Sequence, residues 1–172
     1  MTKASYERLH SYDKYRTREQ NVFTLVLLLV AVLIVLFFLL RFVFGTSRVS
    51  GNSMDPTLVD GQTVFFTRIH TEYHVGDIVC ITMPNGDSYI KRVVACPGDV
   101  VELREGVLYV NNEPQTTYGH GQTLPQEASV TYPYQVEAEK YFVLGDNREA
   151  SVDSRSFGSV YRSQILGKTP HR

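Results

Sequence analysis

The chain has 172 residues, which is enough for one domain of ordinary size and a short appendage. Its formal net charge of −1 gives no basis for binding nucleic acid. Its two cysteines, Cys80 and Cys96, are too few for a disulfide scaffold and lack the spacing of a metal site.

The first predicted element is an apolar helix over residues 22–40, in which Thr24 is the only polar residue. A helix of this length spans about 30 Å, the thickness of the hydrocarbon core of a bilayer. The run is too long for the core of a cleaved signal peptide, although Gly45-Thr46-Ser47 resembles a cleavage site. It is apolar on every face, unlike a buried helix of a soluble protein. We therefore expect a transmembrane signal anchor over residues 22–44.

The charges beside this helix predict its orientation. Residues 1–21 contain five basic and three acidic residues. Arg41 and Arg48 on the other side of the helix reduce the difference in positive charge between its two ends. The positive-inside rule then predicts a cytoplasmic segment over 1–21 and an extracytoplasmic domain over 45–172. An extended chain from Leu40 would keep Ser53 within roughly 45 Å of the point where the helix leaves the membrane.

Residues 45–172 are predicted to form one mostly-β domain, because short runs of β-branched and aromatic residues alternate with turn residues. The expected strands are Thr63–Thr67, Asp77–Met83, Ser88–Ala95, Val100–Leu103, Val107–Val110 and Lys140–Leu144. Residues 112–135, with three prolines, are interpreted as a long segment of low order.

Asn85-Gly86 predicts a two-residue type I′ hairpin between the second and third of these strands. In that register Cys80 faces Lys91 and lies five residues away from the position opposite Cys96. At ~3.3 Å per residue this offset exceeds the Cα separation that a disulfide allows. We therefore expect both cysteines to be free.

Lys91 is the lone charge on one face of the predicted strand 88–95, which it shares with Tyr89, Val93 and Ala95. Burial of an ammonium group lowers its pKa, so a buried Lys91 could act as a general base. The alternative is a lysine on an edge strand whose amine extends into solvent.

Ser53 lies in the segment Gly51–Leu58, and its hydroxyl is inert without an activating base. There is no Gly-x-Ser-x-Gly elbow, because Asp55 occupies the second glycine position. An ordinary turn with Pro56 at its bend is the alternative interpretation.

No histidine lies in a context that favours catalysis. His10 falls in the cytoplasmic segment, His120 in the segment of low order, and His171 next to the end of the chain. His70 and His74 are four residues apart, but they fall in a turn region and make a poor metal pair.

A third polar cluster spans residues 145–158 and follows the last predicted strand. Hydroxyl groups can orient a buried amine without recharging it, and Ser151 and Ser154 are the candidates. Asp153 and Arg155 could pair and stiffen the loop behind the site. The alternative is an exposed loop with no functional role.

The ordered motifs together resemble type I signal peptidases, the membrane-bound serine proteases that remove signal peptides from exported proteins. The matching segments are Ser53–Leu58, Gly76–Val79, Tyr89–Val94 running to Pro97-Gly98-Asp99, and Gly145–Gly158. The single anchor and the small domain resemble the short bacterial form. The resemblance implies a signal-peptidase-like, β-rich catalytic domain.

The resemblance also implies roles for individual residues. Ser53 resembles the nucleophile, Lys91 the general base, and Ser151 the hydroxyl that orients the lysine. The resemblance further implies a supporting role for Asp153, Arg155, Gly145, Asp146, Asn147 and Arg148. It implies a substrate-binding role for Met54, Pro56, Tyr89 and Ile90. Some members place a serine oxyanion donor where Gly51 stands, so we expect backbone N–H groups, including that of Ser53, to form the oxyanion hole.

The expected reaction is hydrolysis of signal peptides by acyl transfer through the Ser-Lys dyad, with no metal or cofactor. The expected partners are signal peptides of exported preproteins, the lipid bilayer and the nearby export translocon, at the cell membrane. Two other functions remain: a Ser-Lys self-cleaving regulator, and a catalytically idle membrane-anchored β module that binds exported chains. The regulator is disfavoured by the apolar span and by the lack of a DNA-binding domain.

Overall fold

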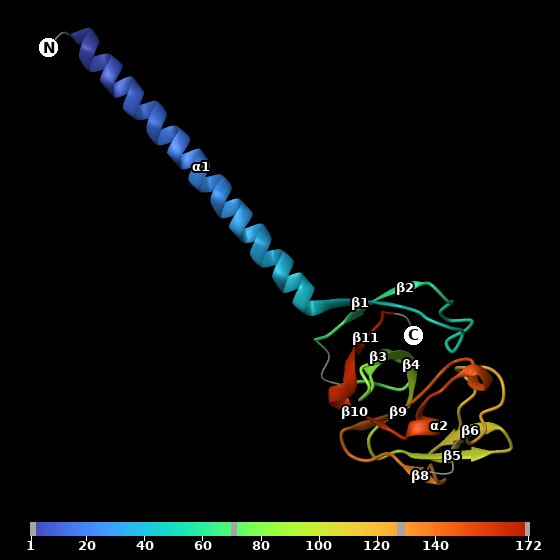
Figure 1. Cartoon of the computed structure of the whole chain (residues 1–172). Helices are drawn as coiled ribbons and strands as arrows, with labels where there is room; N and C mark the ends of the chain where they lie inside the picture. The colour runs from blue at the N-terminus through green and yellow to red at the C-terminus, as the bar shows by residue number, and fades with distance from the viewer. Residues whose placement is uncertain (1–2, 70–71, 127–129, 171–172) are drawn as a thin grey trace. The chain divides into compact units, whose positions relative to one another are not determined.

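The computed structural model describes residues 3–69, 72–126 and 130–170, with side chains described from Gln20 onward. The chain divides into two compact units, Met1–Phe42 and Val43–Arg172, drawn in Figure 1. The basic residues that predict the orientation of the anchor precede Gln20, so their side chains lie outside the described ones.

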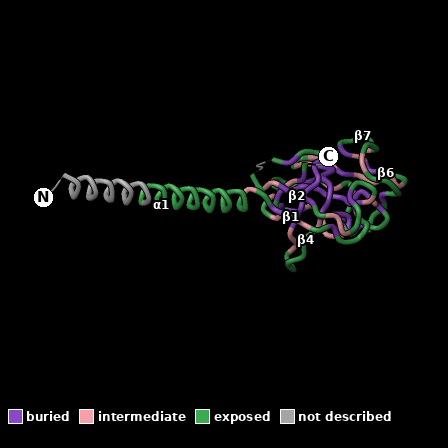
Figure 2. The backbone as a smooth tube through the Cα atoms, turned by 90° about the horizontal axis from the view of Figure 1, so that it is seen from above, coloured by how far each residue is buried: buried purple, intermediate pink, exposed green. Residues whose placement is uncertain are grey.

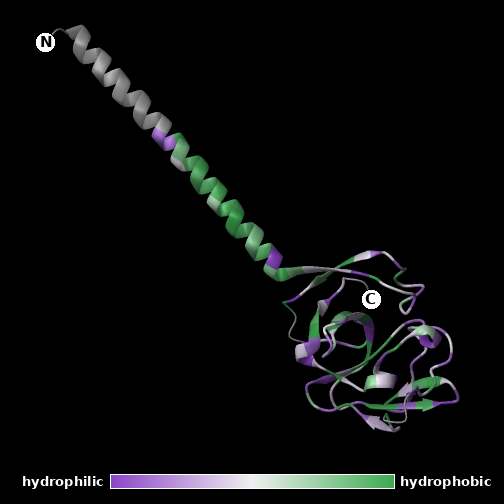
Figure 3. Ribbon diagram, in the orientation of Figure 1, coloured by the Kyte–Doolittle hydropathy of each residue, from purple (hydrophilic) through white to green (hydrophobic). Residues whose placement is uncertain are grey.

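The described residues of the first unit belong to a single helix, α1 (Lys3–Val43). Its segment Gln20–Val43, 24 residues long, is long and apolar enough to cross a membrane, and none of it is buried. Figure 3 shows the mostly apolar colouring of this segment and the polar residues near its two ends. The helix therefore contains the predicted apolar run and continues through the polar residues before it, many of which favour helix.

The second unit is mostly β, as predicted. Its strands are β1 (Phe44–Arg48), β2 (Thr63–Thr67), β3 (Ile78–Thr82), β4 (Ser88–Ala95), β5 (Val100–Arg104), β6 (Val107–Val110), β7 (Glu113–Pro114), β8 (Tyr134–Gln135), β9 (Lys140–Leu144), β10 (Val160–Tyr161) and β11 (Ile165–Lys168). One sheet has the order β1-β2-β11-β3-β4-β9-β10 and the other β7-β6-β5-β8. Short helices η1 (Arg148–Ala150), α2 (Ser154–Phe157) and η2 (Arg162–Gln164) lie among the last strands.

Strands β1 and β11 were not predicted, because each contains a glycine, which weakens a strand pattern. Their formation depends on pairing with distant partners: β1 pairs along its length with β2, and β11 pairs with β2 and β3. Gly45 in β1 lies against the ring of Phe66, and a Cβ there would clash with that ring. Tertiary packing outweighs local propensity at both strands.

The hairpin between β3 and β4 differs from the prediction by one residue. Thr82 pairs with Ser88, and the N–H of Met83 donates to the carbonyl of Asp87 at 2.8 Å, so three residues form the loop. The predicted two-residue turn is wrong because it needs an N–H at Pro84, which proline lacks. Gly86 takes the positive φ that the longer loop requires.

The corrected register places Ile90, rather than Lys91, opposite Cys80. Both cysteines are free, Cys80 buried and Cys96 half-buried, so the predicted absence of a disulfide is confirmed. The alternation along β4 holds as far as Val93, since Ile90 and Val93 pack into different core clusters. Ala95 instead joins the cluster of Val94, because the pairing with β9 shifts register there.

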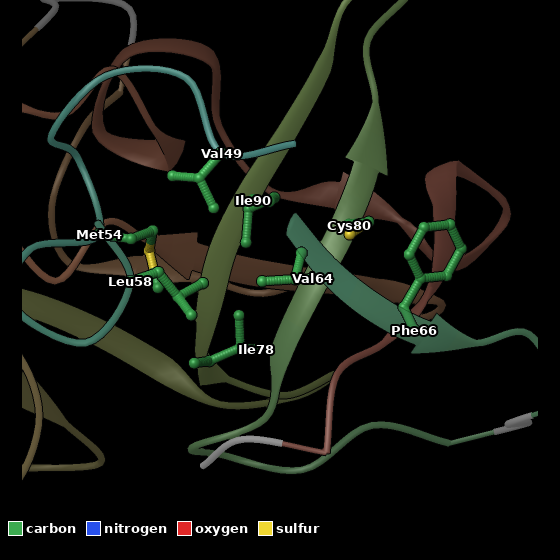
Figure 4. Packing of buried hydrophobic residues seen from close by; sticks show 8 residues of the cluster. All are labelled: Val49, Met54, Leu58, Val64, Phe66, Ile78, Cys80 and Ile90. Carbon is green, nitrogen blue, oxygen red and sulfur yellow. The ribbon is translucent and has the colours of Figure 1, made fainter. Parts of the chain in front are cut away.

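The core of this unit consists of three clusters of buried apolar side chains, and Figure 2 shows buried backbone concentrated inside the domain. One cluster joins strands β2, β3 and β4 to the segment that follows β1 (Figure 4). In that view Met54 and Leu58 point from this segment toward Ile78 and Ile90. The segment is thus fixed to the sheet by its own apolar residues.

The prediction of low order for residues 112–135 is wrong where the structure describes them; residues 127–129 lie outside that description. The N–H of His120 donates to the carbonyl of Asp146 at 2.7 Å, and the N–H of Arg148 donates to the carbonyl of His120 at 3.1 Å. The N–H of Thr123 donates to the carbonyl of Gly106 at 2.8 Å. The segment is ordered by backbone bonds to distant loops, which no sequence period reveals.

Candidate active site

Ser53 lies in the turn between β1 and β2. Core packing and a hydrogen bond to a distant loop fix the backbone of this turn. The next residue, Met54, and Leu58 are buried in the core. The carbonyl of Ser53 accepts a hydrogen bond of 3.0 Å from the N–H of Asn147. The turn therefore presents the Ser53 side chain from a fixed backbone.

Lys91 lies in β4, and its Nζ donates a hydrogen bond of 2.8 Å to Ser53 Oγ. We refer to these two residues as the dyad. Lys91 is only 4% exposed, and β4 is an interior strand between β3 and β9. The alternative of a lysine whose amine extends into solvent is therefore excluded by the burial of Lys91.

Burial lowers the pKa of Lys91 from 10.5 to about 8. The carboxylates of Asp153 and Asp146 oppose this change, and the Arg155 guanidinium adds to it, but burial is the largest cause. Desolvation penalises the ammonium more than these charges stabilise it. The amine can therefore lose its proton at mildly alkaline pH.

Residues 145–158 form a rigid loop beside the dyad. Asp153 and Arg155 are both buried and form a two-point ion pair, with distances of 2.8 Å from Nε to Oδ1 and 2.8 Å from Nη2 to Oδ2. Asp153 Oδ2 also accepts from the N–H of Gly145 at 3.0 Å. The Ser154 hydroxyl accepts from the N–H of Val143 at 2.9 Å and so connects α2 to β9.

Ser151 is buried, and among the described residues its Oγ has no hydrogen-bond partner. The bond expected between Ser151 and Lys91 is therefore not formed in this structure. The hydroxyl nevertheless lies close to the turn that carries Ser53: a Cβ at Gly145 would clash with Ser151 Oγ and would lie 2.5 Å from the Ser53 carbonyl oxygen. Glycine at 145 permits this close approach.

Arg92 and Asp146 form a second buried ion pair that the sequence analysis missed. Arg92 Nε and Nη2 donate to the two carboxylate oxygens of Asp146 at 2.8 and 2.6 Å. Arg92 Nη1 donates to the carbonyl of Gly76 at 2.7 Å, and the guanidinium lies 4.4 Å from the ring centroid of Tyr118. The signal in the sequence was the place of Arg92 itself: a charged residue between apolar neighbours, on the face of β4 opposite Lys91, indicates a buried charge that needs a partner.

Arg148 ties the segment before β8 to the same loop. It is buried, and its three nitrogens donate to the Gly145 carbonyl at 3.0 Å, the Thr123 hydroxyl at 3.0 Å and the Tyr118 carbonyl at 2.8 Å. Burial lowers the pKa of this guanidinium. Arg148 therefore acts as a structural bridge and does not contact the dyad.

A cleft of about 270 Å³ opens beside the dyad. Its lining residues are Arg48, Val49, Ser50, Ser53, Met54, Asp87, Ser88, Tyr89, Ile90 and Lys91. Three of the four expected substrate-binding residues, Met54, Tyr89 and Ile90, therefore lie along it. Pro56 does not line it and is exposed, because Met54 and Leu58 take the inward positions of the turn.

Within the described ranges there is no group of three His, Cys, Asp or Glu side chains that could bind a metal. His74 is exposed and lies 4.0 Å from the Asp77 carboxylate, while His70 falls outside the described residues. His120, which the sequence analysis set aside, is close to the turn that carries Ser53, with Nε2 3.0 Å from the carbonyl oxygen of Asp55.

Comparison with known proteins identifies the family. The family described as signal peptidase, peptidase S26, matches residues 22–172. The chain belongs to this family. Signal peptidase IB of Staphylococcus aureus (strain Mu50 / ATCC 700699) is 35% identical over 157 residues, covering 81% of this chain and 82% of that protein. Signal peptidase I of Bacillus licheniformis is 32% identical over 170 residues, covering 90% of each.

The solved structures include a signal peptidase I from Enterococcus faecalis V583. It is 30% identical to this chain, covers 57% of this chain and 97% of its own length, and superposes with a TM-score of 0.47. The family match and the curated relatives confirm the resemblance drawn from the sequence motifs. The chain is a peptidase of the signal peptidase family.

Proposed function

We propose that this chain is a membrane-bound serine endopeptidase that cleaves N-terminal signal peptides from exported preproteins. Ser53 acts as nucleophile and Lys91 as general base. The observation that carries the proposal is the 2.8 Å hydrogen bond between Lys91 Nζ and Ser53 Oγ, made by a lysine whose pKa is lowered by burial to about 8. Family membership supplies the class of substrate.

The chemical steps are those of acyl transfer. The neutral amine of Lys91 takes the proton of Ser53 Oγ as this oxygen bonds to the scissile carbonyl carbon. The resulting ammonium returns the proton to the leaving nitrogen, and the C–N bond breaks. A water molecule then attacks the acyl-enzyme ester while Lys91 takes its proton, and the proton passes back to Ser53 Oγ as the ester bond breaks.

The developing oxyanion needs hydrogen-bond donors. The N–H of Gly51 donates to Asp60 Oδ1 at 2.8 Å, so this group is committed to the turn. We assign the N–H of Ser53 as a donor to the oxyanion, as the sequence analysis expected.

Ser151 has the proposed role of orienting the Lys91 amine once that amine is neutral. Its buried hydroxyl has no partner among the described residues and lies beside the nucleophile turn. A neutral amine can both donate to and accept from a hydroxyl, whereas an ammonium can only donate. The Asp153–Arg155 ion pair holds the loop that carries Ser151.

The cleft and the edge of β4 provide a place for an extended peptide. Residues Ser88–Lys91 pair with β3 on one side, and the pairing of β4 with β9 begins only at Arg92. A substrate strand can therefore add to β4 beside the dyad, with main-chain hydrogen bonds for affinity and the cleft for side chains.

We further propose that α1 is a single-pass anchor in the cell membrane. The proposed division is a cytoplasmic segment over 1–21, the anchor over 22–44 and an extracytoplasmic catalytic domain over 45–172. The length and composition of Gln20–Val43 support an anchor. The bilayer and the neighbourhood of the export translocon follow as the surroundings of the domain.

The deciding experiment incubates the detergent-solubilised protein with a model preprotein and follows removal of the signal peptide. The wild-type protein should cleave at one site, and Ser53→Ala should not cleave. An idle module that only binds exported chains would leave the preprotein intact with both proteins. A self-cleaving regulator would cut its own chain and leave the preprotein intact.

A further inference from the structure

The turn that carries Ser53 has a side-chain contact with the loop that follows β9. The hydroxyl of Thr57 donates a hydrogen bond of 2.6 Å to Asp146 Oδ2, across 89 residues of sequence. Next to this contact, the N–H of Asn147 donates to the carbonyl of Ser53 itself. Both ends of the turn are thereby attached to neighbouring residues of one loop.

The same carboxylate is attached to the strand of the general base. Arg92, which follows Lys91 in β4, donates to both oxygens of Asp146 at 2.8 and 2.6 Å. Asp146 Oδ2 thus accepts from Arg92 and from Thr57 together. Hydrogen bonds to a buried carboxylate are stronger than bonds between neutral groups, so this junction holds its geometry well.

We propose that Thr57 is a positioning residue for the dyad. Its hydroxyl and the Arg92 guanidinium share one carboxylate, so the nucleophile turn and strand β4 are held at a fixed separation. The distance set in this way is the one between Ser53 Oγ and Lys91 Nζ. The inference rests on the proposed function, because Thr57 acts only through the dyad.

Loss of this hydroxyl should affect the chemical step more than the binding of substrate. A displacement of about 1 Å between reacting groups can cost on the order of 10²-fold in rate. Thr57 is not among the described residues that line the cleft, so its contacts with a bound peptide are unchanged by substitution. The expected signature is a lower kcat with a nearly constant KM.

The test uses the full chain in detergent with a soluble peptide substrate. Thr57→Val and Thr57→Ala remove the hydroxyl and should lower kcat by about 10- to 100-fold, with KM within about twofold. Thr57→Ser keeps the hydroxyl and should retain at least about half of kcat. Thr46→Val is the matched control, because Thr46 is exposed in β1 and pairs with Phe65, away from the dyad.

Several outcomes would overturn the proposal: a Thr57→Val enzyme with more than half of the wild-type kcat, a rise in KM in place of a fall in kcat, or a Thr57→Ser enzyme no better than Thr57→Ala. A fall in kcat that only matches a loss of folded protein, measured by circular dichroism, would overturn it as well. If Thr57→Val does not fold, the comparison of the alanine and serine variants decides.

Ser53→Ala, measured in parallel, separates this inference from the proposed function. If Ser53→Ala remains active, the assignment of the dyad fails. If Ser53→Ala is inactive and Thr57→Val is fully active, only the positioning role of Thr57 fails.

Discussion

Lys91 Nζ donates a hydrogen bond of 2.8 Å to Ser53 Oγ, although the two residues are 38 positions apart in the chain. Lys91 lies in a strand and Ser53 in a turn, and Ile90 of that strand packs in the same core cluster as Met54 of that turn. The pair is therefore a product of the folded domain, which makes its chemistry testable by substitution at either residue.

Ser53→Ala and Lys91→Ala should each lower cleavage by at least the 10²- to 10⁴-fold that a general base contributes, and leave the fold intact. The double variant should be no slower than either single variant, because the two residues act as one unit. Rates on a preprotein, with circular dichroism as a control for folding, measure this. Losses that multiply in the double variant would show that the two residues act independently.

The rate should depend on pH through Lys91. Burial lowers the pKa of this lysine to about 8. Only the neutral amine, which predominates above that pH, can accept a proton, so kcat/KM should fall as the pH drops through about 8. A pH–rate profile on a soluble peptide tests this. Lys91→Arg should be inactive at every pH, because a guanidinium stays protonated. An acidic limb near the 10.5 of an ordinary lysine would contradict the effect of burial.

Ser151→Ala should separate activity from stability. The Ser151 hydroxyl is buried without a partner among the described residues, so its removal should leave the melting temperature unchanged or raise it. The rate should fall by about tenfold or more, because the neutral amine loses the group that orients it. Thermal denaturation and kcat on the same preparation measure both effects. An unchanged rate would remove the proposed role of Ser151.

Gly145→Ala should reduce activity beyond its effect on stability. The added methyl group would clash with the Ser151 side chain and with the Ser53 carbonyl oxygen, and so would move both residues relative to Lys91. Overpacking of this kind costs about 1–3 kcal/mol of stability, and we expect kcat to fall by about tenfold or more. Gly167→Ala is the control, because its Cβ would clash with the Thr67 carbonyl in β2, away from the dyad. Equal effects of both variants on kcat per folded molecule would refute the argument.

Arg155→Met should destabilise the domain strongly. The substitution leaves the carboxylate of Asp153 buried without its cation, which costs about 3–5 kcal/mol. Arg104→Met is the matched control: the Arg104 side chain is 47% exposed in its pair with Glu102, and loss of an exposed pair costs about 0–1 kcal/mol. Urea denaturation of both variants measures the difference. A loss below about 1 kcal/mol for Arg155→Met would show that the buried pair is not a source of stability.

The local sequence predicted those features of the fold and of the site that depend on neighbouring residues. The alternation of Ser88–Ala95 placed Lys91 on a strand, and the resemblance of the Ser53 and Lys91 segments named both residues before their contact was known. The absence of an N–H at Pro84 could have corrected the hairpin register. Asn85-Gly86 is by itself a strong signal for a two-residue turn and favours the other register.

The rest of the site depends on contacts between distant segments. The strand β11 and the bonds of His120 to the loop after β9 form only when those partners are in place. The Arg92–Asp146 pair is equally non-local: the apolar neighbours of Arg92 in β4 indicate that this residue is buried, but they do not identify its partner. No period or spacing in one sequence encodes such pairings, so they had to come from the structure.

The two free cysteines have a chemical consequence for a domain proposed to lie outside the cytoplasm. Burial raises the pKa of the Cys80 thiol to about 12 and also raises that of Cys96, so both remain almost entirely protonated near neutral pH. Oxidants and disulfide exchange act on the thiolate. The domain can therefore persist in an oxidising compartment with unpaired cysteines, protected by slow reaction instead of by a crosslink.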